Sequence, residues 1–327
     1  MKLYFYPSCP REGYTNPYCI NYKHAIGTKF RLLDADNKIT KIKTATLLRY
    51  SFVADVVILN WIENVANLRM GKLQYLLTWL SFLILRIRKK KIVWMFHNIT
   101  PHEGRDKYSD HICDYLYRHA ALIVSHSLEA TDYARKYAHC PVEYICHPVK
   151  NNSTSINKSK KKYHDIIIWG AISPYKGIPE FLEACKDRLI NKSILIIGKC
   201  KDNRLLSRIE ALSSGNVTFD NRFADFNELA AIIRNSQYVL FPYIGDSISS
   251  SGVLMDTLAM GGNPIGPNKG AFRDLQEEGV CLCYKDYDEL IDIINNDTIL
   301  SVKQREDFVA NNSWSHFAEK LKELLEQ

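Results

Sequence analysis

The sequence is poor in the two residues that dominate unstructured and repetitive chains, because only 15 glycines and 11 prolines occur among 327 residues. Disordered, collagen-like and low-complexity chains are rich in these residues, so those classes are excluded. The sequence also contains no short-period repeat and no heptad run. With 46% hydrophobic and 24% charged residues, the chain can bury large cores. Its length favours two domains of about 150 residues each.

Paired cysteines are missing as well. The nine cysteines are odd in number and scattered, and they include no Cys-x-x-Cys pair, which fits a reducing compartment. Residues 1–7 hold one basic residue and an apolar stretch that a proline cuts short, so this segment is too brief for a signal peptide and predicts a first strand. The expected location is therefore the cytoplasm.

Long apolar runs are absent apart from residues 73–85, which precede a basic run at 86–91. A spanning helix needs about 20 apolar residues, and Gln74, Thr78 and Ser81 interrupt this shorter one. The favoured interpretation is a core helix that leads into the next strand. The alternative is an interfacial helix, in which residues 73–91 make a peripheral contact with the inner face of the plasma membrane.

The formal net charge of +7 is concentrated in residues 86–91 and 158–162. Basic runs are usually solvated surface, and the functional alternatives are a nucleic acid, an anionic membrane or an anionic substrate. The sequence contains no recognised nucleic-acid module and no basic strip interleaved with aromatic residues. We therefore expect no nucleic-acid partner.

Short β-branched or aromatic runs alternate with helical patterns along both halves of the chain, which predicts parallel βαβ units. Residues 151–162 are polar and predict a linker between the halves. Two doubly wound sheets follow, and such sheets bind ligands outside the carboxyl ends of their strands. The expected strands are 2–6, 29–34, 54–60, 91–97, 121–125 and 142–146 in the first half, and 165–169, 193–197, 217–219, 238–242, 263–265 and 280–283 in the second.

The most informative segment is residues 241–262. A buried strand ends at Pro242, a small polar loop follows, and a helix begins near the serines at 249–251 and stops at paired glycines. The free N–H groups and the positive dipole end of this helix favour a diphosphate. Gly252 permits close approach, and the carboxylate of Asp256 on the same face can accept hydrogen bonds from sugar hydroxyls. The alternative is that the serines merely cap the helix.

A second segment, residues 165–177, consists of a strand, a glycine turn and Lys176 just before a helix. A lone lysine there would usually be solvated surface. Lys176 and the helix that follows the serines are both expected at the carboxyl ends of strands of one sheet. In that position Lys176 can neutralise a diphosphate leaving group.

These segments resemble glycosyltransferase family 4 and its relatives of the GT-B fold. Residues 170–177 (GAISPYKG) resemble the donor loop G-x-x-x-x-x-K-G, and residues 241–262 look like the segment F-P-x…S-G-V-x-x-x-E-A-x-A-x-G. Asn221-Arg222-Phe223 and the helix after it lie where the family has a turn containing glycine and arginine. Residues 96–103 (FHNITPHE) resemble the H-N-x-x-P-H-E loop, and the helix after Ser313-Trp314 is similar to one that crosses back to the first domain.

The resemblance implies an α/β protein of the GT-B fold, with two Rossmann-like doubly wound parallel-sheet domains facing across a cleft. Residues 1–150, joined by the C-terminal helix 313–327, would bind the acceptor, and residues 163–312 would bind a UDP- or GDP-sugar. The implied reaction transfers the sugar to a hydroxyl of a saccharide or lipid-linked acceptor in cell-surface polysaccharide or glycan synthesis, usually with retention. No metal and no cofactor is implied.

The family's functional positions can be carried over residue by residue. Lys176 would neutralise the diphosphate, and Asp256 stands where a donor-binding glutamate usually stands. His97 would lie at the floor of the cleft near the sugar, so we expect His97, Lys176 and Asp256 to be catalytic. The predicted donor-binding residues are Gly170, Ser173, Lys176, Arg222, Tyr243, Ser250, Ser251, Gly252, Val253 and Asp256. The predicted acceptor side, which follows the ends of three expected strands, consists of Asn60, Trp61, His97, Asn98 and His126.

The sequence departs from the family pattern in several places. Ala171 stands at the position of an arginine, Ile248 stands at the first glutamate of the family's pair, and no glycine-rich loop follows the first strand. Arg222 or Arg273 could supply the missing positive charge. The alternative is a non-catalytic protein that keeps the fold and binds a nucleotide sugar or a partner.

Two further interpretations have ordinary alternatives. His97, His102 and Glu103 could ligate a metal, but their spacing is not a recognised metal pattern and no Cys/His cluster stands nearby, so we expect no metal. Several tyrosines near the start could stack on sugar rings, although core packing explains most of them equally well. These tyrosines are Tyr4, Tyr6, Tyr14, Tyr18 and Tyr22.

Overall fold

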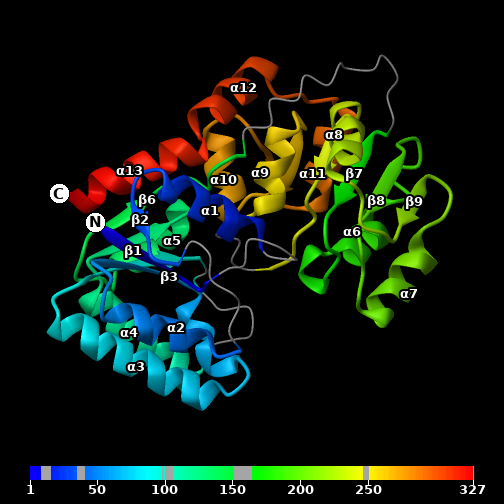
Figure 1. The fold of residues 1–327 in the computed structure, drawn as a ribbon. Coiled ribbons are helices and arrows are strands. Elements are labelled where there is room, and N and C mark those ends of the chain that lie inside the picture. The colour runs from blue at the N-terminus through cyan, green and yellow to red at the C-terminus, as the bar shows by residue number, and fades with distance from the viewer. Residues whose placement is uncertain are drawn as a thin grey trace. The chain divides into compact units, whose positions relative to one another are not determined.

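The computed structural model describes residues 1–8, 16–34, 41–97, 99, 106–150, 164–245 and 250–326. The chain divides into two compact units (Figure 1). Unit 1 consists of Met1–Pro148 and Trp314–Gln327, and unit 2 consists of Val149–Ser313. Each unit contains a six-stranded sheet in which every neighbouring pair is parallel. The predicted α/β class with two parallel sheets is therefore confirmed.

The sheet of unit 1 has the strand order β2-β1-β3-β4-β5-β6. Its chain order reverses between β1 and β3, which is the point where ligands bind in doubly wound sheets. The strand predicted at residues 29–34 is much shorter, since β2 spans two residues. The strands are β1 (Lys2–Tyr6), β2 (Arg31–Leu32), β3 (Val56–Asn60), β4 (Lys91–Phe96), β5 (Leu122–Ser125) and β6 (Val142–Tyr144).

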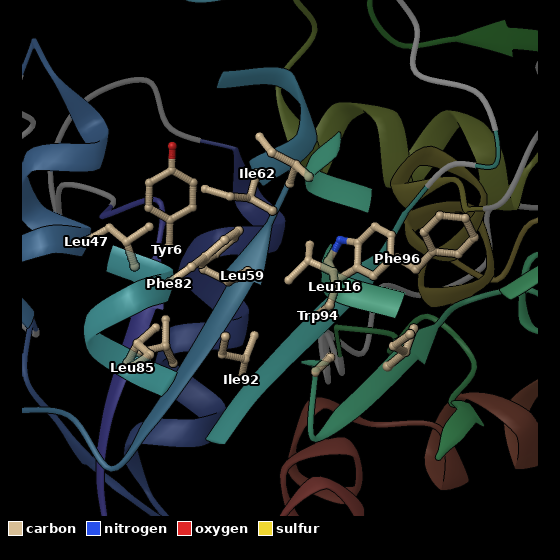
Figure 2. Packing of buried hydrophobic residues seen from close by; sticks show 14 of the residues in the cluster. Tyr6, Leu47, Leu59, Ile62, Phe82, Leu85, Ile92, Trp94, Phe96 and Leu116 are labelled. Atoms are coloured by element: carbon tan, nitrogen blue, oxygen red, sulfur yellow. The ribbon is translucent and has the colours of Figure 1, made fainter. Parts of the chain in front are cut away.

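Helices cover both faces of the unit 1 sheet, because successive side chains along each strand point to opposite faces. On one face, α2, α3 and α4 pack on side chains such as Tyr6, Leu59 and Trp94 (Figure 2). On the other face, α1 and α13 pack on Phe5 and Ile58. The helices are α1 (Pro17–Gly27), α2 (Lys43–Ser51), the 3₁₀ helix η1 (Ile62–Asn67), α3 (Gly71–Ile87), α4 (Lys107–His119), α5 (Leu128–Arg135) and α13 (Trp314–Glu326).

The sheet of unit 2 has the strand order β12-β11-β10-β7-β8-β9, so its chain order reverses between β7 and β10. The predicted strands of this half are all present, and each observed end lies within two residues of the predicted one. They are β7 (Ile166–Trp169), β8 (Ile194–Ile197), β9 (Val217–Asp220), β10 (Tyr238–Leu240), β11 (Pro264–Pro267) and β12 (Leu282–Tyr284). The predicted linker at residues 151–162 falls outside the described residues.

The helices of unit 2 bury their apolar faces on this sheet. Phe181 and Leu182 of α6, for example, join Ile168 and Ile196 in one core cluster. Full burial of a side chain of this size contributes about 1.5–3 kcal/mol. The helices are the 3₁₀ helix η2 (Pro174–Lys176), α6 (Ile178–Cys185), α7 (Asn203–Leu212), α8 (Phe226–Arg234), α9 (Gly252–Ala259), α10 (Gly270–Glu277), α11 (Tyr287–Asn295) and α12 (Val302–Asn311).

The helix α3 differs from the core helix that the sequence favours. It leads into β4 as expected, and its Phe82 and Leu85 enter the core. Its buried face, however, also carries the three polar residues that interrupt the apolar run, and several of its leucines are exposed. Within the described residues, no helix combines the length and the hydropathy that crossing a bilayer requires.

Candidate functional site

The predicted donor residues gather where the sheet of unit 2 reverses its chain order. The loop after β7 runs from Gly170 to Lys176, and the loop after the neighbouring strand β10 contains Tyr243. Both loops leave the carboxyl ends of their strands, which is the edge where doubly wound sheets bind ligands. The topology therefore brings these two sequence segments together.

The ammonium group of Lys176 is buried in this edge, with the residue only 2% exposed. Its Nζ donates a hydrogen bond to the carbonyl oxygen of Trp169 at 3.0 Å and lies 5.7 Å from the ring centroid of Tyr243. Burial lowers the pKa of Lys176 to about 8. Among the described residues no carboxylate forms an ion pair with it. A buried ammonium without a counter-ion is costly, and an anionic ligand would supply the missing charge.

The helix α9 presents its N-terminus at the same edge. Ser251 is its N-cap, because its Oγ accepts a hydrogen bond from the N–H of Leu254 at 3.3 Å, and its hydroxyl also bonds to Tyr243. The capping alternative therefore holds for this serine. The N–H groups of Gly252 and Val253 have no acceptor in the described part of the chain. A Cβ on Gly252 would meet no atom of the described residues within 4 Å.

Lys176 and α9 meet at Gly170. This glycine has φ +95°, and a Cβ added to it would lie 3.1 Å from Nζ of Lys176 and 3.4 Å from Cγ2 of Val253. A second link fixes the arrangement, since Nε1 of Trp169 donates to Oγ1 of Thr257 in α9 at 2.9 Å. The buried cation and the first turn of the helix thus face one small region, as binding of a single diphosphate would require.

Asp256 lies one turn further along α9 on its accessible side and is half-buried. Burial raises the pKa of its carboxyl to about 6, while the positive charge of Lys150 opposes this shift. The group is thus mainly ionised at neutral pH. An ionised carboxylate accepts hydrogen bonds and donates none, so Asp256 is suited to bind hydroxyl groups.

The predicted arginines lie apart from this cluster. Arg222 follows β9, the edge strand two positions away from β7, which corresponds to about 10 Å. Its guanidinium forms ion pairs with Asp220 and Glu228. Arg273 is exposed on α10, and Ala171 is exposed in the loop where the family has its arginine. The guanidinium of Arg222 is thus engaged by two carboxylates, and the role of either arginine in donor binding stays a prediction.

The remaining predicted donor residues take supporting positions. Ser173 is the N-cap of η2, its carbonyl accepts from the N–H of Lys176 at 3.1 Å, and its hydroxyl bonds to Tyr175. Ser250 is half-buried before α9. Tyr243 is buried against the ring of Tyr175, with their centroids 5.3 Å apart. These residues shape the two loops around Lys176.

A cavity that the sequence did not predict adjoins Tyr243 at the carboxyl ends of β10, β11 and β12. Its volume is about 410 Å³. The Oδ1 atom of Asn268 is buried nearby and has no hydrogen-bond partner among the described residues. The sequence feature that marks this site is Pro-Asn-Lys-Gly, a turn between a strand and a helix. The cavity is lined by Pro242, Tyr243, Pro267, Asn268, Lys269, Tyr284, Lys285, Asp286 and Tyr287.

In unit 1, four of the predicted acceptor-side residues converge at the carboxyl edge of the sheet. Nε2 of His97 and Oδ1 of Asn60 are 2.9 Å apart, and Nδ2 of Asn60 donates to the carbonyl oxygen of Tyr6 at 2.9 Å. The ring of Trp61 stacks on His97 with centroids 4.4 Å apart. Trp61 also has φ +51°, a left-handed conformation that is unusual for a bulky residue.

His126 joins the same cluster through Tyr18. Its Nδ1–H donates to the carbonyl oxygen of Ile145 at 2.7 Å, so its Nε2 accepts the hydrogen bond of the Tyr18 hydroxyl at 2.8 Å. The rings of His147 and Trp314 lie 5.3 Å and 5.4 Å from that of Tyr18. The sequence did not single out His147, and it gave no local signal that Trp314 would join a histidine cluster.

Burial keeps the three histidines of this cluster neutral. It lowers the pKa of His97 well below its usual value, the pKa of His126 to about 3 and that of His147 to about 4. The charges of His126 and His147 further lower the pKa of His97, and the charge of His147 further lowers that of His126. Neutral imidazoles can accept or relay a proton but cannot bind an anion by charge. The cluster therefore suits contact with hydroxyl groups better than contact with phosphates.

The structure answers one of the questions that the sequence left open, which concerns the tyrosines near the start. Tyr4, Tyr6, Tyr18 and Tyr22 are buried, so core packing accounts for them. The described residues hold no group of three or more His, Cys, Asp or Glu side chains arranged to bind a metal. The remaining positions lie outside the described residues, namely Tyr14, Asn98, His102, Glu103 and Ile248.

Comparisons with known proteins agree with this geometry. Residues 163–296 match the family model described as "Glycosyl transferases group 1". No curated protein matches the chain. Among solved structures, the chain is similar to Alr3699/HepE from Anabaena in complex with UDP-glucose, with a TM-score of 0.70, 13% identity, and coverage of 100% of this chain and 99% of that one.

Two other similar structures carry named activities. AviGT4, a glycosyltransferase involved in Avilamycin A biosynthesis, has a TM-score of 0.61 at 13% identity, with 99% of this chain and 96% of that chain covered. A trehalose-6-phosphate synthase, described in a study of glycosyl transfer with retention, has a TM-score of 0.65 at 12% identity, with 100% and 99% covered. At these identities the likeness shows the fold, which is GT-B, and leaves the activity to be argued.

Proposed function

We propose that the chain is a metal-independent glycosyltransferase that moves a sugar from a UDP- or GDP-sugar to a hydroxyl of a saccharide or lipid-linked acceptor. The observation that carries the proposal is the meeting of the buried Lys176 ammonium with the open N-terminus of α9 at Gly170. The family model over residues 163–296 and the fold of a protein solved with UDP-glucose support it.

In this proposal unit 2 binds the donor. The diphosphate lies before α9, where it accepts hydrogen bonds from the N–H groups of Gly252 and Val253 and receives the positive charge of Lys176. Asp256, one turn along, accepts hydrogen bonds from ribose or sugar hydroxyls. The diphosphate thereby fills the open space that Gly252 leaves and gives Lys176 a counter-ion.

The reaction breaks the bond between the anomeric carbon and the diphosphate oxygen and forms a bond from that carbon to the acceptor oxygen. The electron pair departs on the diphosphate, and the acceptor hydroxyl gives its proton to an oxygen of this leaving diphosphate. Lys176 and the α9 N-terminus stabilise the negative charge that develops on the leaving group. We propose retention of configuration, which the resemblance and the description of one similar structure favour.

Unit 1 binds the acceptor in this proposal. The half-buried indole of Trp61 covers His97, so an acceptor ring meets Trp61 first, and aromatic faces are well suited to stack on sugar rings. Asn60 orients His97 through a hydrogen bond, and His126 is a further neutral side chain at this edge of the sheet. The proposed setting is the cytoplasm, in the synthesis of cell-surface polysaccharide or glycan.

A panel of nucleotides and nucleotide sugars tests the proposal. UDP, GDP and their sugars are added to the protein, the melting temperature is recorded, and hydrolysis of the stabilising donor is then followed. We expect one base to stabilise the protein, and we expect slow hydrolysis that Lys176→Met abolishes while Lys186→Met, on the surface after α6, retains it. Failure of every nucleotide to bind would refute the donor site.

The non-catalytic alternative gives a different result. In that case a nucleotide sugar binds and shifts the melting temperature, but neither hydrolysis nor transfer follows with any acceptor tested. This comparison is needed because Ala171 stands at the position where the family has an arginine. Binding and turnover must therefore be measured on the same preparation.

A further inference from the structure

The helix α3 presents its most apolar side chains to solvent. Leu76 is 60% exposed, Leu80 45%, Leu83 53% and Ile87 71%. Their spacings of four, three and four residues place them in one stripe along the helix. Single exposed leucines are common on soluble proteins, but a continuous stripe marks a surface that contacts another apolar phase.

The opposite, buried face of α3 carries polar residues at positions where the buried face of a helix is usually apolar. Gln74, Thr78 and Ser81 are buried there, beside Phe82 and Leu85, which point into the core (Figure 2). Thr78 Oγ1 donates to the carbonyl of Gln74 at 2.9 Å, and Ser81 Oγ donates to the carbonyl of Leu77 at 2.7 Å. Because the helix itself satisfies these hydroxyls, the polar face can stay inside and the leucines remain outward.

Basic residues follow the stripe. Arg86, Arg88 and Lys89 are exposed, and within the described residues none of them forms an ion pair. The next two lysines are already engaged, since Lys90 pairs with Asp55 at 3.0 Å and Nζ of Lys91 donates to the carbonyl of Leu325 at 2.8 Å. Three exposed cations thus lie at the end of an apolar stripe, with no ion-pair partner in the part of the chain that the structure describes.

A second pair of exposed apolar residues adjoins the same end of α3. Phe52 is 51% exposed and Val53 is 48% exposed. They stand just before Asp55, whose carbonyl accepts from the N–H of Lys91 and whose carboxylate pairs with Lys90. The apolar surface therefore continues from α3 onto the turn after α2, around the cations.

We propose that α3 docks unit 1 on the surface of an anionic lipid bilayer. The stripe of Leu76, Leu80, Leu83 and Ile87 enters the boundary between headgroups and acyl chains, and Arg86, Arg88 and Lys89 contact the anionic headgroups. An apolar stripe combined with cations complements such a surface. A second copy of the chain would bring the same cations against each other, so charge does not favour a dimer through this face. A helix of 17 residues with a polar inner face lies in the interface instead of crossing it.

Docking uses none of the residues proposed to bind the donor, so it goes beyond the proposed function and is independent of it. If both hold, docking would bring the acceptor side to lipid-linked acceptors. Lys176→Met should float with vesicles as the wild-type protein does. A loss of nucleotide binding and a loss of membrane binding are therefore separable results.

Flotation with vesicles tests the inference on the full chain without nucleotide. Vesicles of phosphatidylcholine alone are compared with vesicles that also contain phosphatidylglycerol. Two variants probe the two components, and both change exposed side chains, so folding is checked by circular dichroism. The stripe variant carries Leu76→Gln, Leu80→Gln and Leu83→Gln, and the charge variant carries Arg86→Glu, Arg88→Glu and Lys89→Glu.

Matched controls make the same changes on exposed residues of unit 2. The apolar control carries Ile190→Gln, Ile299→Gln and Val302→Gln, and the charge control carries Lys201→Glu, Arg204→Glu and Lys303→Glu. We expect the wild-type protein and both controls to float with the anionic vesicles. Each basic residue near an anionic surface strengthens binding about fivefold, so the charge variant should lose at least about tenfold in apparent affinity.

The stripe variant should lose binding to a similar degree. Flotation of either test variant at the wild-type level would overturn the inference. The inference would also be overturned if light scattering showed a dimer for the wild-type protein and a monomer for the stripe variant, while the wild-type protein bound neither kind of vesicle.

Discussion

Nε2 of His97 lies 2.9 Å from Oδ1 of Asn60, and the amide nitrogen of the same asparagine donates to the carbonyl of Tyr6. The second bond fixes the orientation of the amide, so Oδ1 must be the acceptor and Nε2–H of His97 the donor. The neutral ring therefore carries its lone pair on Nδ1. Asn60 thus determines both the place and the tautomer of the histidine at the carboxyl end of β4.

Replacing Asn60 with alanine should destabilise unit 1. The change removes a hydrogen bond from the Tyr6 carbonyl and leaves the buried His97 N–H without its Asn60 acceptor, and losses of this kind cost about 1–3 kcal/mol each. We expect a loss of about 2–4 kcal/mol in the free energy of unfolding, measured by urea denaturation. Asn67→Ala, on the exposed side of η1, is the control and should change stability by less than about 0.5 kcal/mol. Equal losses in the two variants would argue against the hydrogen-bond pair.

The neutral histidine cluster should make unit 1 sensitive to acid. The pKa of His126 falls from 6.5 to about 3 and that of His147 from 6.5 to about 4 on folding. Between pH 6.5 and 4 the unfolded chain binds protons that the folded unit does not, so stability falls as the pH falls. Each histidine contributes a slope of up to about 1.4 kcal/mol per pH unit.

His147→Asn isolates one of these contributions. Asparagine can keep a hydrogen bond to the Pro148 carbonyl but does not titrate, so the slope of stability against pH should decrease by about 1.4 kcal/mol per unit in this range. The buried carboxyl of Glu63, whose pKa burial raises to about 7, acts in the opposite direction and is common to both proteins. The control is His24→Asn, which changes an exposed histidine. The prediction would be wrong if stability depended on pH with the same slope in His147→Asn as in this control.

Lys176→Met should stabilise unit 2 while it weakens nucleotide binding. Folding lowers the pKa of Lys176 from 10.5 to about 8, which means that the charged group is held at a cost at pH 7. Methionine fills a similar volume without charge, so the free energy of unfolding should increase by about 1–3 kcal/mol. The loss of the hydrogen bond to the Trp169 carbonyl reduces this gain. Lys186→Met should show neither effect. A variant that is less stable and still binds nucleotide normally would show that Lys176 is structural.

The charge of Lys176 also predicts how binding depends on pH. The ammonium form is the one that attracts a diphosphate, and its pKa of about 8 means that the charge is lost as the pH rises above 8. The dissociation constant of the preferred nucleotide should then increase by up to about tenfold per pH unit, measured by calorimetry. In Lys176→Met the dissociation constant should not follow this curve. A parallel rise in both proteins would assign the effect to another group.

Much of this arrangement could be predicted from the sequence, because the signals were local. The β-branched runs at residues 166–169 and 194–197 form fully buried parallel strands, which show up as continuous apolar stretches. Lys176 stands seven residues after Trp169, at a fixed distance from a strand end. Since parallel strands bring their carboxyl ends to one edge, the strand assignment alone predicted that Lys176 and the loop after β10 would face that edge.

The parts that the sequence did not predict depend on contacts between distant segments. Tyr18, His126 and Trp314 meet in one cluster, yet no spacing within any one segment reveals it. The orientation of α3 could not be predicted from the sequence for a different reason. Thr78 and Ser81 look like interruptions of an apolar run, but their hydroxyls bond to the preceding turn of the helix, so polarity alone did not decide which face was buried.

Gly252→Ala offers the sharpest test of the donor site, because stability and binding should move in different directions. A Cβ at this position meets no atom of the described residues within 4 Å, and alanine is a better helix former than glycine by up to about 1 kcal/mol. The variant should therefore be at least as stable as the wild-type protein. Its Cβ, however, enters the space before the α9 N–H groups where we place the diphosphate, so nucleotide affinity should fall at least about tenfold.

The matched comparison for this variant is Gly245→Ala, in the loop after β10, where an added Cβ also meets no atom within 4 Å in the part of the chain that the structure describes. If the diphosphate binds at the α9 N-terminus, Gly252→Ala should weaken binding more than Gly245→Ala, because its added atom stands directly at the first turn of the helix. Calorimetric titration of both variants with the preferred nucleotide gives the two dissociation constants. An unchanged constant in Gly252→Ala, with Lys176→Met still impaired, would mean that the anion contacts the lysine from a side other than the helix, and the position of the diphosphate in our proposal would be wrong.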